Sequence, residues 1–310
     1  MNKSPKIAIL LATYNGSRFL SEQLDSILSQ TYTNFILVVR DDCSTDNTRS
    51  MLEDYRQTHA DKMHLLEPDV RNQGASASFS CLLEYVLQHK QVLELDRAYM
   101  MFCDQDDVWY SDKIERQVQS MLAAEAAAVN LPVLVHSDLE VVSEALVQIA
   151  PSFIRYQGLE IQRNQFCQIV ISNLVTGCTV FINEALAREA CPVPQQAIMH
   201  DWWLALVATA FGKLVLLDAP LVHYRQHGRN TIGAKEHAKL PVISLSLWQR
   251  VFARKPNEHL YEVARQAREF SMRYGRQLSW RQRSGLRVSA AMRVRSGFLQ
   301  RLCYRVARCF

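Results

Sequence analysis

Short apolar runs alternate with segments of helical periodicity along the first half of the chain. The runs are IAILL at 7–11, FILVV at 35–39, YMMFC at 99–103 and VLVH at 133–136. After the first run, Leu20, Leu24, Ile27 and Leu28 recur at helical spacing, and two more helical segments follow, STDNTRSMLEDY and ASASFSCLLEYVLQ. This alternation predicts a layered α/β fold with a mainly parallel sheet.

Polar or acidic side chains come directly after each of these predicted strands. They are Thr13, Asn15, Asp42, Asp104, Asp106 and Asp138. In parallel sheets, ligands bind at the carboxyl edge of the strands, where loops and helix N-termini meet. We therefore expect these side chains to form one site at that edge.

The composition, 48% apolar and 21% charged over 310 residues, is that of an ordinary soluble protein. No apolar run approaches the ~20 residues needed to cross a bilayer, and the N-terminal run is too short for a signal peptide. Eight cysteines occur singly and no CxxC pair is present. This pattern favours reduced thiols in a cytoplasmic protein over a zinc site or a disulfide framework.

Charge divides the chain into two parts. Residues 1–240 hold 20 Lys and Arg against 28 Asp and Glu, whereas residues 241–310 hold 15 against 3. We therefore expect a catalytic domain at 1–240 and a basic helical extension at 241–310.

The basic extension also carries an apolar stripe. Nine arginines and no acids occur in 276–310, together with apolar residues at three- and four-residue steps: Val288, Ala291, Met292, Leu299, Leu302, Cys303, Val306 and Phe310. This pattern favours an amphipathic helix on an anionic membrane surface. The alternative is a helical hairpin packed back onto the acidic domain. No recognition motif accompanies the charge, so nucleic acid is not expected as a partner.

Three carboxylates lie within four positions in the segment CDQDDVW: Asp104, Asp106 and Asp107. A single aspartate at a strand end is often a turn former, as we interpret Asp46 and Asp112. Three together repel one another unless a cation joins them, and such hard oxygen ligands suit Mg²⁺ or Mn²⁺ shared with a substrate phosphate. No GxGxxG follows the first strand and no GxxxxGK[ST] exists, so metal and side chains must hold that phosphate.

Several motifs, in this order, resemble an inverting family 2 glycosyltransferase: ILLATYNGSRFLSEQLDSILSQTY, VVRDDCSTDNT, RNQGASASF, FCDQDDVW, MHDWW and HYRQHGRN. The segments HSDL, NLVTGCT and YRQHGRN are similar to bacterial rhamnosyltransferases of O-antigen and capsule synthesis. The resemblance ends near residue 240. It implies a GT-A fold, which is a Rossmann-like, mainly parallel sheet flanked by helices. Cys43 departs from the family, which usually has glycine there.

The resemblance implies roles for residues at the donor site. The nucleotide-sugar contacts would be Thr13, Tyr14, Asn15, Asp42, Arg71, Asn72, Gly74 and Asp104, with Asp42 accepting from the imide N–H of uracil or thymine. Metal would be bound by Asp106, with Asp107 as a further candidate. In HYRQHGRN, cations follow an apolar strand: Arg225 fits a bidentate diphosphate contact, and His227 fits the metal shell or a phosphate. His136, His200 and His223 fit structural roles.

The resemblance places the catalytic base at Asp201. That residue also opens an apolar segment of helical length, where a carboxylate can serve as an N-cap. A general base needs only a free carboxylate oxygen, so both roles are compatible. Trp202 and Trp203 fit the core or a sugar-stacking wall, and Asn173, Thr176 and Gly177 are expected under the acceptor.

Together these features predict a metal-dependent glycosyltransferase at the cytoplasmic face of the inner membrane. The resemblance implies a donor sugar linked to dTDP or UDP and favours dTDP-rhamnose. It also implies a lipid-linked saccharide as acceptor. Two alternatives remain open. A sugar-1-phosphate nucleotidyltransferase would need a Gly-rich, basic phosphate loop, which LLATYNGSR lacks. A non-catalytic nucleotide-sugar-binding protein would bind the donor without turnover.

Overall fold

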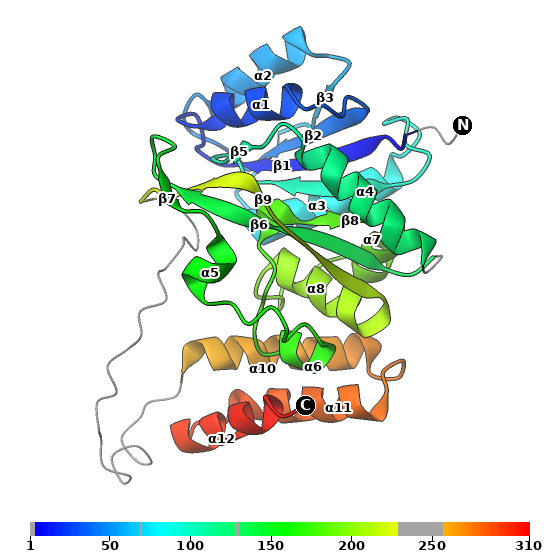
Figure 1. Ribbon diagram of the computed structural model, residues 1–310, viewed down its shortest axis with the longest axis vertical. Helices are drawn as coiled ribbons and strands as arrows, with labels where there is room; N and C mark the ends of the chain where they lie inside the picture. Colours follow the sequence, from blue (N-terminus) through cyan, green and yellow to red (C-terminus); the bar gives the residue numbers. More distant parts are fainter. Residues whose placement is uncertain (1–3, 69, 128–129, 229–256) are drawn as a thin grey trace.

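One twisted sheet forms the centre of the computed structural model, which describes residues 4–68, 70–127, 130–228 and 257–310 (Figure 1). The strands follow in the order β3-β2-β1-β4-β8-β6-β9-β5, and β7 pairs with β6. Their bounds are β1 Ile7–Thr13, β2 Phe35–Asp41, β3 Met63–Leu65, β4 Tyr99–Cys103, β5 Val108–Trp109, β6 Val133–Val142, β7 Gln148–Ala150, β8 Phe181–Ile182 and β9 Lys213–Arg225.

The predicted α/β fold with a mainly parallel sheet is confirmed. Strand β1 pairs in parallel with β2 and β4, and β2 pairs in parallel with β3. The short strand β8 runs antiparallel to both β4 and β6, and β9 is parallel to β6. The four strands predicted from apolar runs are β1, β2, β4 and β6, so β1, β2 and β4 end at one edge.

One sequence expectation about that edge is wrong. Asp138 does not follow a strand, because β6 continues past it to Val142. Its buried carboxylate accepts hydrogen bonds from the backbone N–H groups of Leu139 and Ile154, at 2.8 and 3.1 Å. Asp138 therefore fixes the start of helix α5 (Phe153–Gln157) and does not belong to the edge site.

Helices cover both faces of the sheet, and the alternation of side chains along β1 explains why. Ala8 and Leu10 face one core, and Ile7, Ile9 and Leu11 face the other. The remaining helices are α1 Leu20–Leu28, α2 Thr48–Thr58, α3 Ala75–Gln88, α4 Lys113–Ala126, α6 Phe166–Ile169, η1 Gly177–Thr179, α7 Glu184–Ala190, α8 His200–Phe211, α10 Glu258–Tyr274, α11 Trp280–Ala290, η2 Ala291–Arg293 and α12 Gly297–Ala307.

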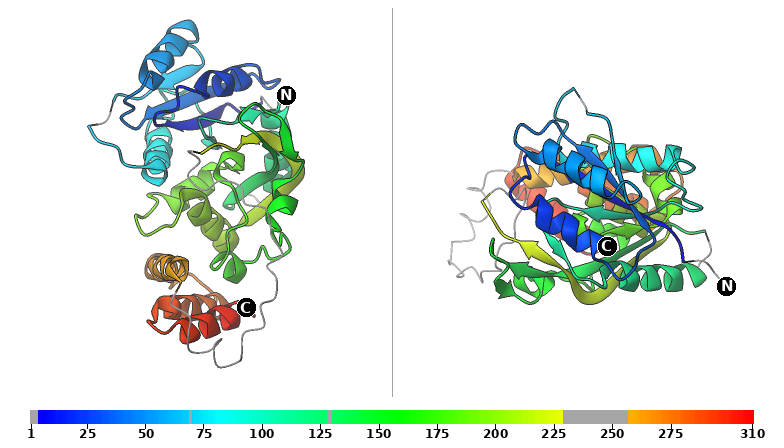
Figure 2. Two further views of the ribbon diagram at one scale, coloured as in Figure 1. Left: turned by 90° about the vertical axis from the view of Figure 1, so that its left-hand side faces the viewer. Right: turned by 90° about the horizontal axis from the view of Figure 1, so that it is seen from above.

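The C-terminal helices lie together at one end of the molecule, with α10 next to α6 and α8 (Figures 1 and 2). Helix α10 buries an apolar face in the same core as α3 and α8, and the ring of Phe270 lies 5.2 Å from that of Trp203. For the segment 276–310, the alternative of packing back onto the domain is therefore correct for α11, whose Leu286 is buried in the same core. The predicted boundary at 240 lies outside the described residues, so the division into two domains stays a prediction.

The apolar stripe expected along 276–310 is divided between two surfaces. The chain turns at 291–296, so Met292 is fully buried against the core, whereas Leu299, Leu302 and Val306 are exposed on α12. Among the described residues, no helix combines the length and the apolar character that crossing a bilayer requires.

Candidate active site

A cavity of about 660 Å³ opens at the carboxyl ends of β1, β2 and β4. Seven of the predicted donor-site and catalytic residues line it together with the metal candidate Asp106: Thr13, Tyr14, Asp42, Asn72, Gly74, Asp104 and Asp201. The cavity continues past them to α5, to the segment 173–177 and to the first turns of α8 and α10. The lining does not include Asn15, Arg71, Asp107, Arg225 or His227.

Asp42 joins the end of β2 to the loop that precedes α3. Its buried carboxylate accepts hydrogen bonds from the backbone N–H groups of Gln73 and Gly74 and pairs with Arg40 at 2.8 Å. Asn72 Nδ2 donates to the main-chain oxygen of Asp42. Gly74 has a φ of +83°, which glycine adopts without steric cost, and it starts α3 beside the cavity. A nucleobase N–H that reached Asp42 would share an oxygen that is already hydrogen-bonded.

Gln105, the middle residue of the DxD segment, connects β1 to the acidic loop. Its side-chain oxygen accepts from the backbone N–H of Tyr14 at 2.8 Å, and its side-chain nitrogen donates to the Tyr14 oxygen at 3.0 Å. Asn15 instead supports the turn after β2, since its side-chain oxygen accepts from the backbone N–H of Thr45. Gln105 could not be singled out from the sequence, because its role arises from a contact with a residue 91 positions away.

The departure at Cys43 has a backbone explanation. Cys43 adopts a φ of +65°, in the left-handed region that favours glycine. The family's usual glycine fits that conformation without strain, and here a half-buried cysteine takes its place. The turn that follows Asp42 is therefore preserved by this residue.

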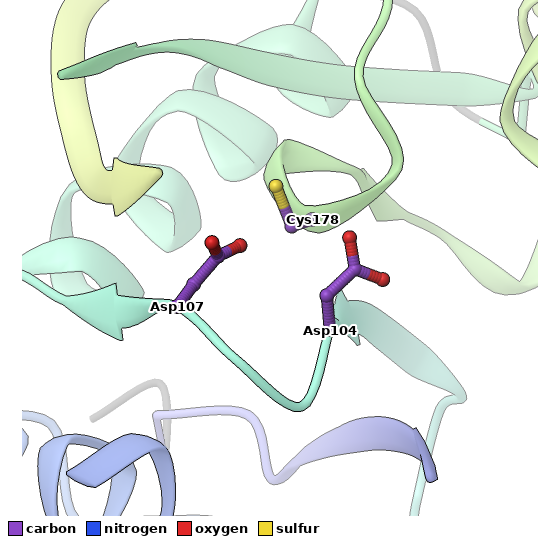
Figure 3. A group of neighbouring side chains, drawn as sticks. All are labelled: Asp104, Asp107 and Cys178. Carbon is purple, nitrogen blue, oxygen red and sulfur yellow. The ribbon is translucent and has the colours of Figure 1, made fainter. Parts of the chain in front are cut away.

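Asp104, Asp107 and Cys178 point toward one another (Figure 3). One possible ligand atom of each lies within 4.8 Å of the others. Burial, followed by the charges of Asp106 and Asp201, raises the pKa of Asp104 to about 7. Burial and the neighbouring charges of Asp106 and Asp104 also raise the pKa of Asp107 well above its usual range. Burial likewise raises the pKa of the Cys178 thiol, so it stays protonated.

Asp106 and His227 form the second part of the acidic site. Nε2 of His227 lies 2.8 Å from a carboxylate oxygen of Asp106, and the imidazole packs on Phe19. The Asp106 side chain lines the cavity, whereas His227 lies behind it and contacts its carboxylate. The two residues predicted to share a metal shell, 121 positions apart, are therefore brought together.

Arg225 is fixed inside the protein. Its guanidinium group donates to the main-chain oxygens of Asp106 and Glu144, pairs with Glu22 at 2.6 Å and lies over the Phe19 ring. Its backbone N–H donates to Asp107. With 1% of its surface exposed, Arg225 holds the acidic loop in place. From the sequence we expected Arg225 to contact the diphosphate. Its guanidinium group instead contacts other protein groups, and it does not line the cavity.

The donor set fits a small hard cation. Among the described residues, Oδ2 of Asp107 is buried without an N–H or O–H donor. Burial and the repulsion between neighbouring carboxylates raise the pKa values of Asp104 and Asp107, and a bound cation would relieve that repulsion. Carboxylate oxygens suit Mg²⁺ and Mn²⁺, and an imidazole is compatible with Mn²⁺, whereas a protonated thiol is a poor ligand for either. Asp104 and Asp106 face the cavity and are therefore placed to share a cation with a bound diphosphate.

Asp201 lies in the first turn of α8 and is buried. The N-cap of α8 is Met199, so the alternative that Asp201 is the N-cap is wrong. The backbone N–H groups of Trp202 and Gly177 and the side chain of Asn173 donate to its carboxylate, and Trp202 N lies 2.6 Å away. Burial outweighs these hydrogen bonds and raises the pKa of Asp201 to about 7. A carboxylate with this pKa can accept a proton near neutral pH.

The remaining predicted side chains have structural or supporting places. His200 is buried between Phe79 and Phe102, and burial lowers the pKa of its imidazole to about 3. His136 is also buried, with its pKa lowered to about 4. Trp203 and Trp202 are both buried in the core, and Trp202 also lines the cavity with the 5% of its surface that is exposed.

Lys113, which sequence reasoning missed, is fully buried below the acidic loop. Its Nζ lies 4.3 Å from the centre of the Trp109 ring and donates to Gln117. Burial lowers the pKa of Lys113 to about 8, although the charge of Asp107 acts in the opposite direction. In the sequence, Lys113 looks like any lysine on the outside of a helix.

The sequence family described as Glycosyl transferase family 2 matches residues 8–188. The dTDP-rhamnosyl transferase RfbG of Shigella flexneri is 28% identical over 248 residues, which cover 79% of this chain and 81% of that protein. The enzyme WfgD of Escherichia coli, a UDP-Glc:alpha-D-GlcNAc-diphosphoundecaprenol beta-1,3-glucosyltransferase, is 30% identical over 116 residues, which cover 37% and 41% of the two chains. The chain thus spans less than half of WfgD.

Solved structures share the fold. TarS of S. aureus, residues 1–349 in complex with UDP-GlcNAc, has a TM-score of 0.57 at 14% identity and covers 93% of this chain and 71% of its own. The mannosyltransferase PcManGT of Pyrobaculum calidifontis, in complex with GDP-Man and Mn²⁺, has a TM-score of 0.55 at 15% identity, with coverages of 99% and 74%. At these identities the likeness shows the GT-A fold alone.

Proposed function

The chain belongs to glycosyl transferase family 2, and we propose that it is a metal-dependent inverting enzyme of bacterial cell-surface polysaccharide synthesis, such as the O-antigen of lipopolysaccharide. Family membership makes it a glycosyltransferase rather than the nucleotidyltransferase or the non-catalytic protein considered from sequence. The observation that supports the mechanism is that one cavity is lined both by Asp201 and by the acidic pair Asp104 and Asp106. A base and a leaving-group site are what a single displacement at a sugar carbon requires.

In the proposed reaction, the Asp201 carboxylate takes the proton of an acceptor hydroxyl. The hydroxyl oxygen then bonds to C1 of the donor sugar while the bond from C1 to the phosphate oxygen breaks, which inverts the configuration at C1. General-base assistance of this kind typically contributes ~10²–10⁴-fold. The protonated Asp201 stays stable at this position because its surroundings already favour the neutral carboxyl.

Asp106 and His227, with Asp104 or Asp107, are the residues that would hold Mg²⁺ or Mn²⁺. Such an ion neutralises charge that develops on the departing diphosphate. Gln105 and Arg225 support this from the protein side, because they fix the acidic loop to β1 and β9. Arg71, which is exposed next to Asn72, remains a proposed nucleotide contact.

L-rhamnose from dTDP-rhamnose is the donor that we favour. The support is the similarity to RfbG, which is named a dTDP-rhamnosyl transferase and aligns over most of both chains. The test is a panel of dTDP-, UDP- and GDP-linked sugars, in which release of nucleoside diphosphate is measured with Mg²⁺, with Mn²⁺ and with chelator. We expect metal-dependent release that is fastest with dTDP-rhamnose. If no member of the panel is cleaved or bound by folded protein, the proposal is wrong.

We further propose a lipid-linked saccharide as acceptor and a peripheral position on the cytoplasmic face of the inner membrane. The support is the outer face of α12, where Phe298, Leu299, Leu302 and Val306 are between 43% and 47% exposed. The C-terminal helices and the turn between them also carry exposed arginines: Arg281, Arg283, Arg287, Arg293, Arg295, Arg305 and Arg308. An exposed apolar helix face in an arginine-rich segment matches the boundary of an anionic bilayer.

Vesicle co-sedimentation tests the membrane contact. Wild type should bind phosphatidylcholine vesicles that contain phosphatidylglycerol and should not bind pure phosphatidylcholine. The double substitution Leu302→Ser and Val306→Ser should abolish binding, whereas Met272→Ser, at an exposed position of α10, should not. If both variants bind the anionic vesicles as tightly as wild type, the contact lies elsewhere on the protein.

A further inference from the structure

The far end of the cavity is built by elements outside the donor-binding sheet edge. Its lining comes from α5, from the segment 173–177, and from the first turns of α8 and α10. We infer that His259, from the C-terminal helix α10, is an acceptor-selecting residue that forms a sugar-binding edge with Trp202. This inference rests on the proposed glycosyl transfer, because it assigns the second substrate to the same cavity.

His259 extends the cavity beyond the part of the chain that matches the family. It lies 71 positions past residue 188, and it is the cavity-lining residue that the C-terminal helices contribute among the residues the structure describes. Its ring lies 5.8 Å from the Trp202 ring, with the two planes 34° apart. Trp202 directly follows Asp201 in α8. The two rings therefore lie next to each other beside the proposed base, with the indole 5% exposed and the imidazole as the more accessible part of the edge.

The protein fixes this edge from behind and leaves the imidazole accessible. The Trp202 Nε1 donates to the main-chain oxygen of Ile169 at 2.6 Å, which sets the orientation of the indole. The His259 side chain is 53% exposed, and its Nδ1 lies 3.6 Å from Glu262 on the next turn. That separation is longer than a hydrogen bond, so the ring is available to a ligand.

Helix α12 holds the start of α10 in position. The fully buried Gln300 accepts from the backbone N–H of Asn257 at 2.7 Å and donates to the Asn257 oxygen at 3.1 Å. Asn257 is the N-cap of α10, and its side-chain oxygen accepts from the His259 N–H at 2.9 Å. The C-terminal helices thus place His259 at the cavity through a chain of hydrogen bonds.

The chemistry of the edge matches a pyranoside. The C–H face of a sugar ring is apolar and packs on aromatic rings, while its hydroxyls need polar partners. Here two aromatic rings adjoin the Asp201 carboxylate and the side chains of Asn173 and Thr176, which also line the cavity. A hydroxyl of the stacked ring would then be directed at the base, which is the geometry that transfer requires.

The test compares His259→Ala, His259→Phe and His59→Ala. His59 is a matched control, since it is also partly exposed near a helix end and stacks on a ring, that of Tyr55, at 6.1 Å. The probes are octyl glycosides of rhamnose, glucose, galactose and N-acetylglucosamine, with the donor identified by the nucleotide-sugar panel. The measurements are the KM and kcat for each glycoside, the donor Kd, and saturation-transfer NMR of the glycoside ring protons.

We expect His259→Ala to raise the glycoside KM by about 10-fold with little change in kcat or donor Kd, as for loss of uniform binding. His259→Phe, which keeps a flat ring, should recover most of the affinity, and His59→Ala should behave as wild type. If His259→Ala and His59→Ala have the same glycoside KM, the inference is wrong. It is also wrong if His259→Ala raises the donor Kd by the same factor as the glycoside KM. Saturation transfer detects glycoside binding without turnover, so its absence for every glycoside would contradict the acceptor site even if donor cleavage is intact. If no donor in the panel is cleaved or bound, the proposed function itself is wrong.

Discussion

The acidic loop 104–107, of which Asp104 and Asp106 line the cavity, and the single carboxyl of Asp201 form two groups with different electrostatic surroundings. Asp104, Asp106 and Asp107 crowd one loop, where His227 contacts Asp106 and the buried Lys113 lies below. Asp201 stands in the first turn of an apolar helix and is held by backbone N–H groups and an amide. The first group carries more negative charge than its neighbours compensate, whereas the second is a single carboxyl kept close to neutrality by burial.

This difference separates two chemical tasks. A crowded set of carboxylates becomes favourable when a divalent cation enters, so it suits the departing diphosphate. A buried carboxyl with a pKa of about 7, held by hydrogen bonds in the first turn of α8, exchanges a proton near neutral pH, so it suits activation of a hydroxyl. Burial raises the pKa in both places, but additional negative charges contribute mainly in the loop.

The substitution Asp201→Asn should have the largest effect. An amide keeps the shape and cannot take a proton, so we expect kcat to fall by ~10²–10⁴-fold while donor affinity changes little. Release of nucleoside diphosphate gives kcat, and calorimetry gives the donor Kd. Asp112→Asn, at the N-cap of α4, is the control and should keep wild-type activity. Full activity of Asp201→Asn would remove Asp201 from the mechanism.

Asp106→Ala should weaken metal binding at the acidic loop. Loss of a residue that hydrogen-bonds to a metal ligand typically costs about 10–100-fold in metal affinity, so loss of a direct ligand should cost at least as much. We expect the variant to need a correspondingly higher Mn²⁺ concentration for half-maximal donor binding. In the presence of chelator, the donor affinities of the variant and of wild type should be similar. Donor affinity of wild type that is the same with Mn²⁺ and with chelator would contradict the metal role.

The donor half of the site was more accessible to sequence reasoning than the acceptor half. Strands β1, β2 and β4 carry their apolar and polar pattern locally, so Thr13, Asp42 and Asp104 could be placed at one edge from periodicity alone. The pairing of His227 with Asp106 needed the family resemblance. The proposed base Asp201 was also identified from the resemblance, because an aspartate before an apolar helix otherwise resembles an ordinary cap.

Features that depend on long-range packing could not be predicted. Arg225 looked like a phosphate ligand, because the pattern of HYRQHGRN does not reveal that Glu22 and Asp106 lie around its guanidinium group. The stripe in 276–310 gave no sign of the turn that buries Met292 and exposes Leu302. His259 is one of several histidines in the sequence, and only the packing of α10 against α8 brings it to the cavity.

The smallest expected effect is on the pH dependence of stability, and it tests whether Asp201 is buried as a nearly neutral carboxyl. Its pKa is about 7 in the folded protein against an ordinary value of 3.8, so between these values the folded state binds more protons than the unfolded state. The contribution of this group to stability therefore decreases as the pH rises through that window. In metal-free buffer, the Tm of Asp201→Asn should fall less than that of wild type between those pH values and should exceed it near neutrality. Parallel Tm profiles of the two proteins would mean that Asp201 is ionised and solvated in the folded state, and the contrast between the two groups of carboxylates would then disappear.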